Sequence, residues 1–288
     1  MFAIIGGVIV IGCVIGGYVA MGGHIEVLIQ PFELVIIGGG ALGAFITSNP
    51  MWVVKKCFGS IGTVIKGSKH NKDSYLELLG LQYTLFKLLK TKGPMVLEQH
   101  LEHPEDSALF QQYPKFHGGH HAVHFLCDYL RLITLGTTNS HELEEVLEQE
   151  IETHHQEQNQ VAGAIQTVAD ALPALGIVAA VLGIIKTMGA INEPPEILGG
   201  LIAGALVGTF LGVLLAYGFV GPFAAALKSI YDSEAKYYQC IKTGLLSYLQ
   251  GYAPAVAVEM ARKTVLSEER PTFHEVEDAC AVVPAPAV

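Results

Sequence analysis

Histidine is the residue type whose spacing in this sequence could support metal chemistry. The chain has 288 residues and 12 histidines, and four of these lie in the segment HGGHHAVH as His117, His120, His121 and His124. His120 and His124 are four residues apart, so on a helix both rings could reach one Zn²⁺ ion, with Asp128 as a further candidate ligand. We favour a solvated histidine patch, and a metal site is the alternative.

Sequence motifs of common enzyme classes are missing. The chain has no G-x-x-x-x-G-K-S/T phosphate loop, no G-x-S-x-G nucleophile motif and no H-E-x-x-H zinc motif. Its five scattered cysteines show no CxxC spacing, which argues against a disulfide framework or a thiolate metal site. We therefore expect a protein that is not an enzyme and that holds no metal or organic cofactor.

Long uncharged runs identify the chain as a membrane protein. Hydrophobic residues make up 51% of the sequence, charged residues 15%, and the mean hydropathy is +0.42. A bilayer core needs about 20 apolar residues per helix. The runs predict four spans, joined as two hairpins, at residues 2–21, 34–54, 171–191 and 199–221. Asn49 and Pro50 are expected to mark the end of the second span at the membrane interface.

The soluble segments complete an all-α architecture. Leucines and aromatics recur at spacings of three and four between Tyr75 and Leu89, which is typical of a helix with one buried face. We expect a polytopic membrane protein with four transmembrane helices and a large helical cytoplasmic domain. The predicted parts are a first transmembrane hairpin at 1–54, the cytoplasmic domain at 55–169, a second hairpin at 170–227, and a cytoplasmic C-terminal helix and tail at 228–288.

Basic residues predict the orientation. None of the 17 lysines and arginines lies in the loops 24–33 and 192–198, and all but Lys186 lie in 55–169 or after Leu227. Basic loops stay in the cytoplasm, so both termini are expected on that side. Lys186 lies near the outer end of its span, where its side chain can snorkel to the surface; a buried functional lysine is the alternative.

Carboxylates are missing from the predicted spans. All 27 acidic residues lie outside them, and Asp170 is only at a mouth. Ionisable residues within a membrane usually mark ion paths. Either the chain moves no ions, or a partner helix supplies the acid. Thr209 is one of the few polar side chains deep in a span.

Glycines and prolines mark the second hairpin. The last span carries a row of glycines at spacing four, which lets another backbone approach closely: Gly200, Gly204, Gly208 and Gly212. Pro173 is expected to open the third span and Pro222 to close the fourth. Because proline has no N–H, these two residues free the carbonyls of Ala169 and Gly218. A plain kink at a helix end is the alternative reading of each proline.

Several segments together resemble the MotA family of flagellar motor stator subunits, within the MotA/TolQ/ExbB proton channel family. The resemblance covers roughly residues 1–262 and rests on these stretches: QPFELVIIGGG, SYLELL, DYLRLI, QEIETH, DALPALGIVAAVLGI, ALVGTFLGVLLAYGFVGP and LLSYLQGYAP. It implies that Pro173 and Pro222 couple ion flow to torque. It also implies that Lys90 and Glu98 contact the rotor and that Glu150 matches a further charged position. The family usually has Arg where this chain has Lys90, and Lys lacks the bidentate fork.

The resemblance also implies the partners and the coupling ion. The partners would be MotB, whose single span supplies the intramembrane aspartate, and the rotor switch-complex protein FliG. Five copies would surround two MotB chains in the bacterial inner membrane, in contact with lipid and without nucleic acid. Sodium-driven relatives have threonine where this chain has Ala180. The pair Ala180 and Thr209 therefore offers few side-chain oxygens to a sodium ion, and we expect protons to be the coupling ion. A sodium site completed by the freed backbone carbonyls is the alternative.

Two other kinds of protein remain open at this point. An energiser of the ExbB or TolQ kind also surrounds partner helices and uses proton flow, but it has three spans and acts on an outer-membrane system. The first hairpin, with QPFELVIIGGG, disfavours it. A structural membrane scaffold without ion flow is the third possibility.

Overall fold

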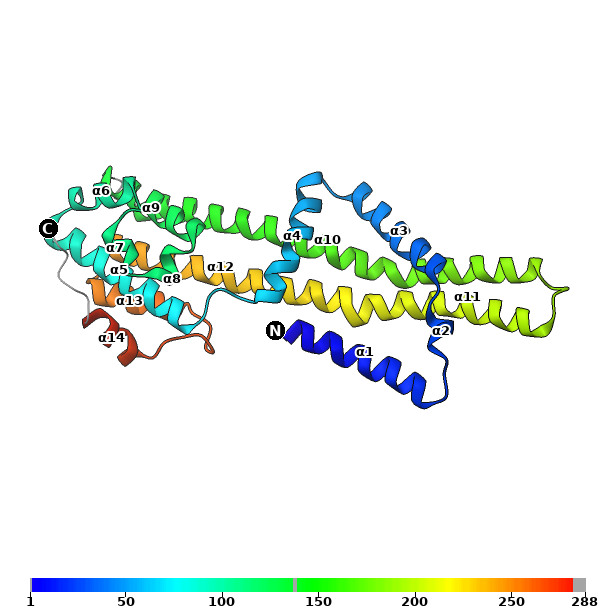
Figure 1. Cartoon of the computed structure of the whole chain (residues 1–288). Coiled ribbons are helices and arrows are strands. Elements are labelled where there is room, and N and C mark those ends of the chain that lie inside the picture. The colour runs from blue at the N-terminus through cyan, green and yellow to red at the C-terminus, as the bar shows by residue number, and fades with distance from the viewer. Residues whose placement is uncertain (1, 137–138, 282–288) are drawn as a thin grey trace. The chain divides into compact units, whose positions relative to one another are not determined.

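The structure is a computed structural model that describes residues 2–136 and 139–281, and within these residues all regular secondary structure is helical (Figure 1). The chain divides into two compact units. Unit 1 comprises residues 1–67 and 156–231, and unit 2 comprises residues 68–155 and 232–288. The expected all-α fold is confirmed. Unit 2 begins after Gly67, so residues 55–67 belong to unit 1, and the predicted boundaries between membrane and cytoplasmic parts stay predictions.

Among the described residues, four helices are long and apolar enough to cross a membrane. The first is α1 (Phe2–Ala20), and the second comprises the short α2 (Ile25–Leu28) and α3 (Pro31–Ser48). The third expected span, 171–191, lies in α10 (Ser140–Gly189) except for its last two residues. The fourth begins as α11 (Pro195–Leu215) and continues through the π-helix η1 (Ala216–Val220) into α12 (Gly221–Leu249).

The second expected span is divided. Helix α3 ends at Ser48, and a separate helix α4 (Met51–Lys66) begins after Pro50. Proline cannot donate to the preceding turn, and it disfavours a helical conformation at Asn49. The Asn49 side chain donates from Nδ2 to the Phe45 carbonyl, 2.9 Å away. The helix in the predicted span 34–54 therefore ends at Ser48, beside the Asn49 and Pro50 that were expected to mark its end, and residues 51–54 belong to the next helix.

The glycine row is used mainly within the chain, where α10 and α11 lie side by side (Figure 1). A Cβ atom built on Gly212 would lie 2.6 Å from the Leu172 carbonyl oxygen, and one built on Gly208 would lie 3.0 Å from Ala179 Cβ. A Cβ on Gly204 would lie 3.2 Å from the Gln30 amide nitrogen, and only Gly200 is open. The row was predicted to let another backbone approach closely, and in the structure its near neighbours are α10 and Gln30, just before α3.

Helix α10 contributes two glycines to the same contact. A Cβ on Gly176 would lie 2.9 Å from the Gly208 carbonyl oxygen, and one on Gly183 would lie 2.7 Å from Ala205 Cβ. The two residues are seven apart, so they share one face of α10. The hairpin of unit 1 is thus held by close contact between backbones, with α3 packed beside it through Ile37 and Ala41.

Unit 2 is built around α5 (Lys72–Lys92), most of which is buried. A capping box starts it, in which Asn71 Oδ1 accepts from the Ser74 N–H at 3.0 Å and Ser74 Oγ accepts from the Asn71 N–H at 2.8 Å. Gly93, at φ +83°, ends it. Around α5 lie the remaining helices of the unit: α6 (Met95–Glu102), α7 (Ala108–Gln111), α8 (Pro114–His117), α9 (His120–Thr134), α13 (Pro254–Lys263) and α14 (Phe273–Ala281).

The C-terminal part contains more helices than the single helix and tail that were predicted for it. Helix α14 contacts α5, and Lys72 Nζ lies 2.7 Å from Glu275 Oε1. That pair and the bonds from Thr272 lower the pKa of Glu275 to about 2. The predicted tail at 282–288 lies outside the described residues.

The glycine contact generates the first prediction. Gly212→Ala would place a methyl group against the Leu172 carbonyl, where backbone cannot move aside cheaply, and we expect destabilisation of about 1–3 kcal/mol. Gly200→Ala is the matched control, because the same methyl at Gly200 meets nothing within 4 Å. The measurement is thermal unfolding of the detergent-solubilised chain. Equal melting temperatures for the two variants would contradict the assigned contact.

Candidate torque and ion-pathway residues

Pro173 lies in the interior of a helix, not at its start. Helix α10 begins at Ser140 and continues past Pro173 to Gly189. A proline at this position cannot bond to the carbonyl of Ala169, four residues earlier, and its ring crowds the same carbonyl. The alternative reading of Pro173 as a kink at a helix end is therefore wrong, and its place at the start of the third membrane span stays a prediction. The loss of one backbone hydrogen bond follows from the proline itself.

Pro222 follows directly on the π-helix η1. The Gly221 N–H donates to the Ala216 carbonyl five residues earlier, and α12 then continues to Leu249. A Cβ atom on Gly221 would lie only 2.9 Å from that carbonyl oxygen, so the wide turn requires a glycine. Pro222 thus closes no helix; it lies where an α-helix resumes after one π-turn, a frequent position for a kink.

The two proline regions meet within unit 1. The Cβ atom of Ala169, whose carbonyl Pro173 leaves without its usual donor, lies 3.9 Å from a Cβ built on Gly221, the residue before Pro222. Ala169 is buried. Two weakened points in the backbone, 49 residues apart in sequence, are therefore neighbours. The sequence contained both prolines, but nothing in it indicated that they would pair through Ala169 and Gly221.

Ala180 and Thr209 flank the glycine contact. The Ala180 nitrogen lies 3.2 Å from a Cβ built on Gly208, and the Thr209 Cα lies 3.3 Å from one built on Gly176. Ala180 is only 9% exposed because α11 covers it, while Thr209 is half-buried. The small side chain of Ala180 thus serves packing between the two helices. The place of Ala180 on a pore wall stays a prediction. Gly176, which anchors the contact, was not singled out from the sequence, although its seven-residue spacing from Gly183 can be seen there.

Lys90 and Glu98 flank the turn between α5 and α6 in unit 2. Lys90 lies in the last turn of α5 and Glu98 in the first turn of α6, and both are exposed. A cation at a helix C-terminus and an anion at an N-terminus are both favoured by the helix dipole. Within the described part of the chain neither forms an ion pair. The arrangement presents two unpaired charges of opposite sign on one turn.

Glu150 has a partner inside unit 2. Its Oε2 atom accepts a hydrogen bond of 2.6 Å from the hydroxyl of Tyr129, which is buried. Burial first, and then this bond to the carboxylate, raise the pKa of Tyr129 above its usual range. Lys242 pairs with the neighbouring Glu148 and lowers the pKa of that carboxyl. Glu150 therefore has a structural role, which its resemblance to a charged position of the family did not reveal.

The histidine segment and Lys186 can now be placed. His117 Nε2 lies 3.1 Å from the Glu105 carbonyl, and His120 Nδ1 lies 3.2 Å from the Glu105 carboxylate. No group of three or more His, Cys, Asp or Glu side chains in the described ranges is arranged to hold a metal. Lys186 is exposed in the last turn of α10, as snorkelling requires.

Comparison with known proteins places the chain in a family. The family model described as motility protein A N-terminal matches residues 4–93, and that of the MotA/TolQ/ExbB proton channel family matches residues 121–240. Motility protein A of Salmonella typhimurium is 45% identical over 278 residues, covering 96% of this chain and 94% of its own. The Escherichia coli protein is 43% identical, covering 99% and 97%.

Solved structures share the fold. The structure of C. jejuni MotAB matches with a TM-score of 0.78 at 20% identity, covering 94% of this chain and 98% of that chain. The flagellar MotAB stator complex from Bacillus subtilis matches with a TM-score of 0.73 at 24% identity, covering 89% and 92%. With the near full-length identity to motility protein A, these findings show that the chain belongs to the motility protein A family, within the MotA/TolQ/ExbB proton channel family.

Proposed function

We propose that this chain is a stator subunit of the bacterial flagellar motor, which forms a proton channel with MotB and converts ion flow into torque on the rotor. The observation that carries the proposal is the junction of the two proline regions through Ala169 and Gly221, in a chain of this family. Two backbone sites without regular hydrogen bonds can change geometry at small cost, as a torque-coupling element requires. The role is not enzymatic.

The acid-free spans support a complex with a partner. All 27 acidic residues lie outside the predicted spans, so proton transfer needs a carboxylate from another chain. The similar solved structures are MotAB complexes, which favours MotB as that partner and an oligomeric assembly. A ring of five copies around two MotB chains, in the inner membrane with both termini in the cytoplasm, is the form we propose. The motility protein A match over residues 4–93 includes the first hairpin and disfavours an ExbB-like energiser.

The function is tested by complementation and by proton flux. The gene should restore swimming to a strain that lacks its own motility protein A. In liposomes the chain alone should conduct no protons, whereas the chain with its MotB partner should leak once any plug segment is removed. Robust proton flux through the chain by itself would contradict the proposal.

The second prediction concerns the prolines. Pro173→Ala restores an N–H that can bond to the Ala169 carbonyl, and Pro222→Ala does the same for Gly218. We expect normal insertion and assembly but loss of swimming. Pro195→Ala is the control, because Pro195 begins α11, where a missing N–H costs nothing. If both test variants swim as well as the control, the prolines are only structural.

The third prediction concerns the rotor contact, which we assign to FliG. Exposed charge pairs contribute only about 0–1 kcal/mol each, so neutralising Lys90 or Glu98 should be mild. Reversal to Lys90→Glu or Glu98→Lys replaces attraction with repulsion and should abolish most swimming at unchanged membrane levels.

A reversal elsewhere in unit 2 controls for net charge. Lys263→Glu changes an exposed lysine of α13 and should leave swimming intact. Glu150 suits the test less well, because reversing it would also remove the acceptor of buried Tyr129. Full motility in both the Lys90 and the Glu98 reversals would refute the assignment.

The fourth prediction concerns the coupling ion. Sodium needs several oxygen ligands once it loses its water, whereas a proton needs one carboxylate. Ala180 has no side-chain oxygen, and Thr209 alone would leave sodium under-coordinated. We therefore expect swimming speed at fixed pH to be independent of external sodium and to fall with a protonophore. Speed that saturates with sodium and survives the protonophore would instead support the sodium site.

A further inference from the structure

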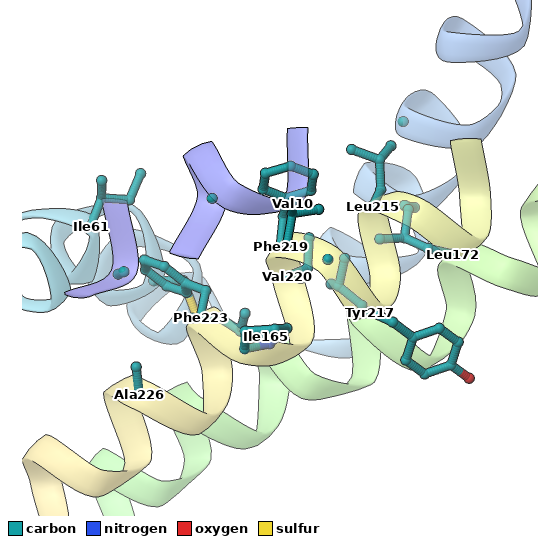
Figure 2. Close-up of a pocket in the computed structure, with 18 of the residues that line it drawn as sticks. Val10, Ile61, Ile165, Leu172, Leu215, Tyr217, Phe219, Val220, Phe223 and Ala226 are labelled. Carbon is teal, nitrogen blue, oxygen red and sulfur yellow. The ribbon is translucent and has the colours of Figure 1, made fainter. Parts of the chain in front are cut away.

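Unit 1 contains a cavity of about 910 Å³ between α1, α3, α4, α10 and η1 (Figure 2). No charged residue is among the residues described as lining it, and Cys57 and Tyr217 are the polar side chains there. Figure 2 shows the Tyr217 hydroxyl directed away from the other labelled side chains, which are aliphatic or phenyl groups such as Ile61, Phe219 and Phe223. The interior of the cavity is therefore hydrocarbon.

The cavity reaches the surface of the unit. Leu42, Phe58 and Ile61 line it and are 48%, 60% and 49% exposed. The helices around it include spans long enough to cross a membrane, so the surrounding medium is lipid. Water gains few hydrogen bonds in an apolar cavity of this kind. An acyl chain, in contrast, can enter from the side and gains dispersion contacts with the lining.

A cationic and aromatic cluster adjoins the cavity on α4. Trp52, Lys55 and Lys56 directly precede the lining residues Cys57 and Phe58. Lys55 lies three residues before Phe58 and therefore on the same face of the helix. Tryptophan and lysine are typical of the membrane interface, where headgroups lie.

The two lysines differ in their partners. Lys56 Nζ lies 3.2 Å from Glu157 Oε2 and 5.1 Å from the centroid of the Trp52 ring. Lys55 is exposed and forms no ion pair with any residue in the described ranges. A free cation thus stands beside the hydrocarbon cavity, and it lacks a counter-charge from its own chain.

We propose that this site binds an anionic phospholipid, with one acyl chain in the cavity and the phosphate at Lys55. A spanning helix from a second copy is the competing occupant. The predicted spans carry no acid, so such a helix would leave Lys55 without a counter-charge, whereas a lipid phosphate supplies one. The inference does not depend on the stator function.

The chain's single tryptophan, Trp52, reports on this site. The full chain is reconstituted in phosphatidylcholine vesicles that contain either dibrominated phosphatidylglycerol or dibrominated phosphatidylcholine at the same mole fraction. Bromine quenches tryptophan fluorescence on contact. We expect stronger quenching by the brominated phosphatidylglycerol. Lys55→Gln should weaken the apparent affinity for that lipid about fivefold, the effect of one lysine near an anionic surface.

A matched pair of variants in α1 tests the acyl site. Gly6 lines the cavity and Gly12 does not, while a Cβ atom on either meets nothing within 4 Å. Gly6→Leu fills the cavity and should lower the lipid preference, and Gly12→Leu should retain it. Circular dichroism and size-exclusion profiles check that each variant folds. If Gly6→Leu does not fold, Lys55→Gln still tests the headgroup site independently.

Three outcomes would overturn the inference. Equal quenching by the two brominated lipids in the unmodified chain would show no headgroup selection. Selectivity that survives Lys55→Gln would place the phosphate elsewhere. The third outcome uses a Phe58→Cys variant that also carries Cys13→Ser and Cys57→Ser. If copies of this variant cross-link in membranes where neither lipid is preferred, a protein helix covers the cavity.

Discussion

The membrane unit depends on direct backbone contact between α10 and α11. Gly176, Gly208 and Gly212 bring the two helices close together. A Cβ atom on Gly176 or Gly212 would lie 2.9 or 2.6 Å from a carbonyl oxygen, and one on Gly208 would lie 3.0 Å from Ala179 Cβ. In lipid the hydrophobic effect does not hold helices together, so close packing between small residues must do so. A side chain larger than hydrogen at these positions would force the two helices apart.

This close packing lets the chain accommodate two prolines in one region. Each proline leaves a carbonyl without its regular donor, and an unsatisfied polar group in hydrocarbon costs several kcal/mol. Burial against a neighbouring helix keeps that backbone away from lipid, as at Ala169 beside Gly221. The π-turn at Ala216–Val220 re-forms one bond at a longer reach, from the Gly221 N–H to the Ala216 carbonyl. The result is a buried pair of irregular backbone sites held by a rigid glycine contact.

The soluble unit follows different rules. Water covers its surface, so its core is apolar and its charges lie outside, and a buried polar group needs a named partner. Gln82 meets this need at one end, because its amide nitrogen donates to the Ile241 carbonyl at 3.1 Å and Gly244 leaves room for it, whereas its Oε1 atom is buried without a hydrogen-bond partner among the described residues. Lys90 and Glu98 are exposed on this unit and form no ion pair within the described residues, and the rotor contact is proposed there. Glu150, with a comparable charge, is instead committed to Tyr129.

The sequence by itself determined the helical class, the four apolar runs, the two prolines and the family resemblance, because each depends on composition or on local spacing. It could not determine which glycines would meet which backbone, because the register between two helices depends on how both pack in three dimensions. Gly200 and Gly212 look equivalent in the row, yet only Gly212 is in contact. The same reason explains the meeting of Ala169 with Gly221 and the cavity beside Lys55. Those features arise from which segments lie next to each other, and only the tertiary structure decides that.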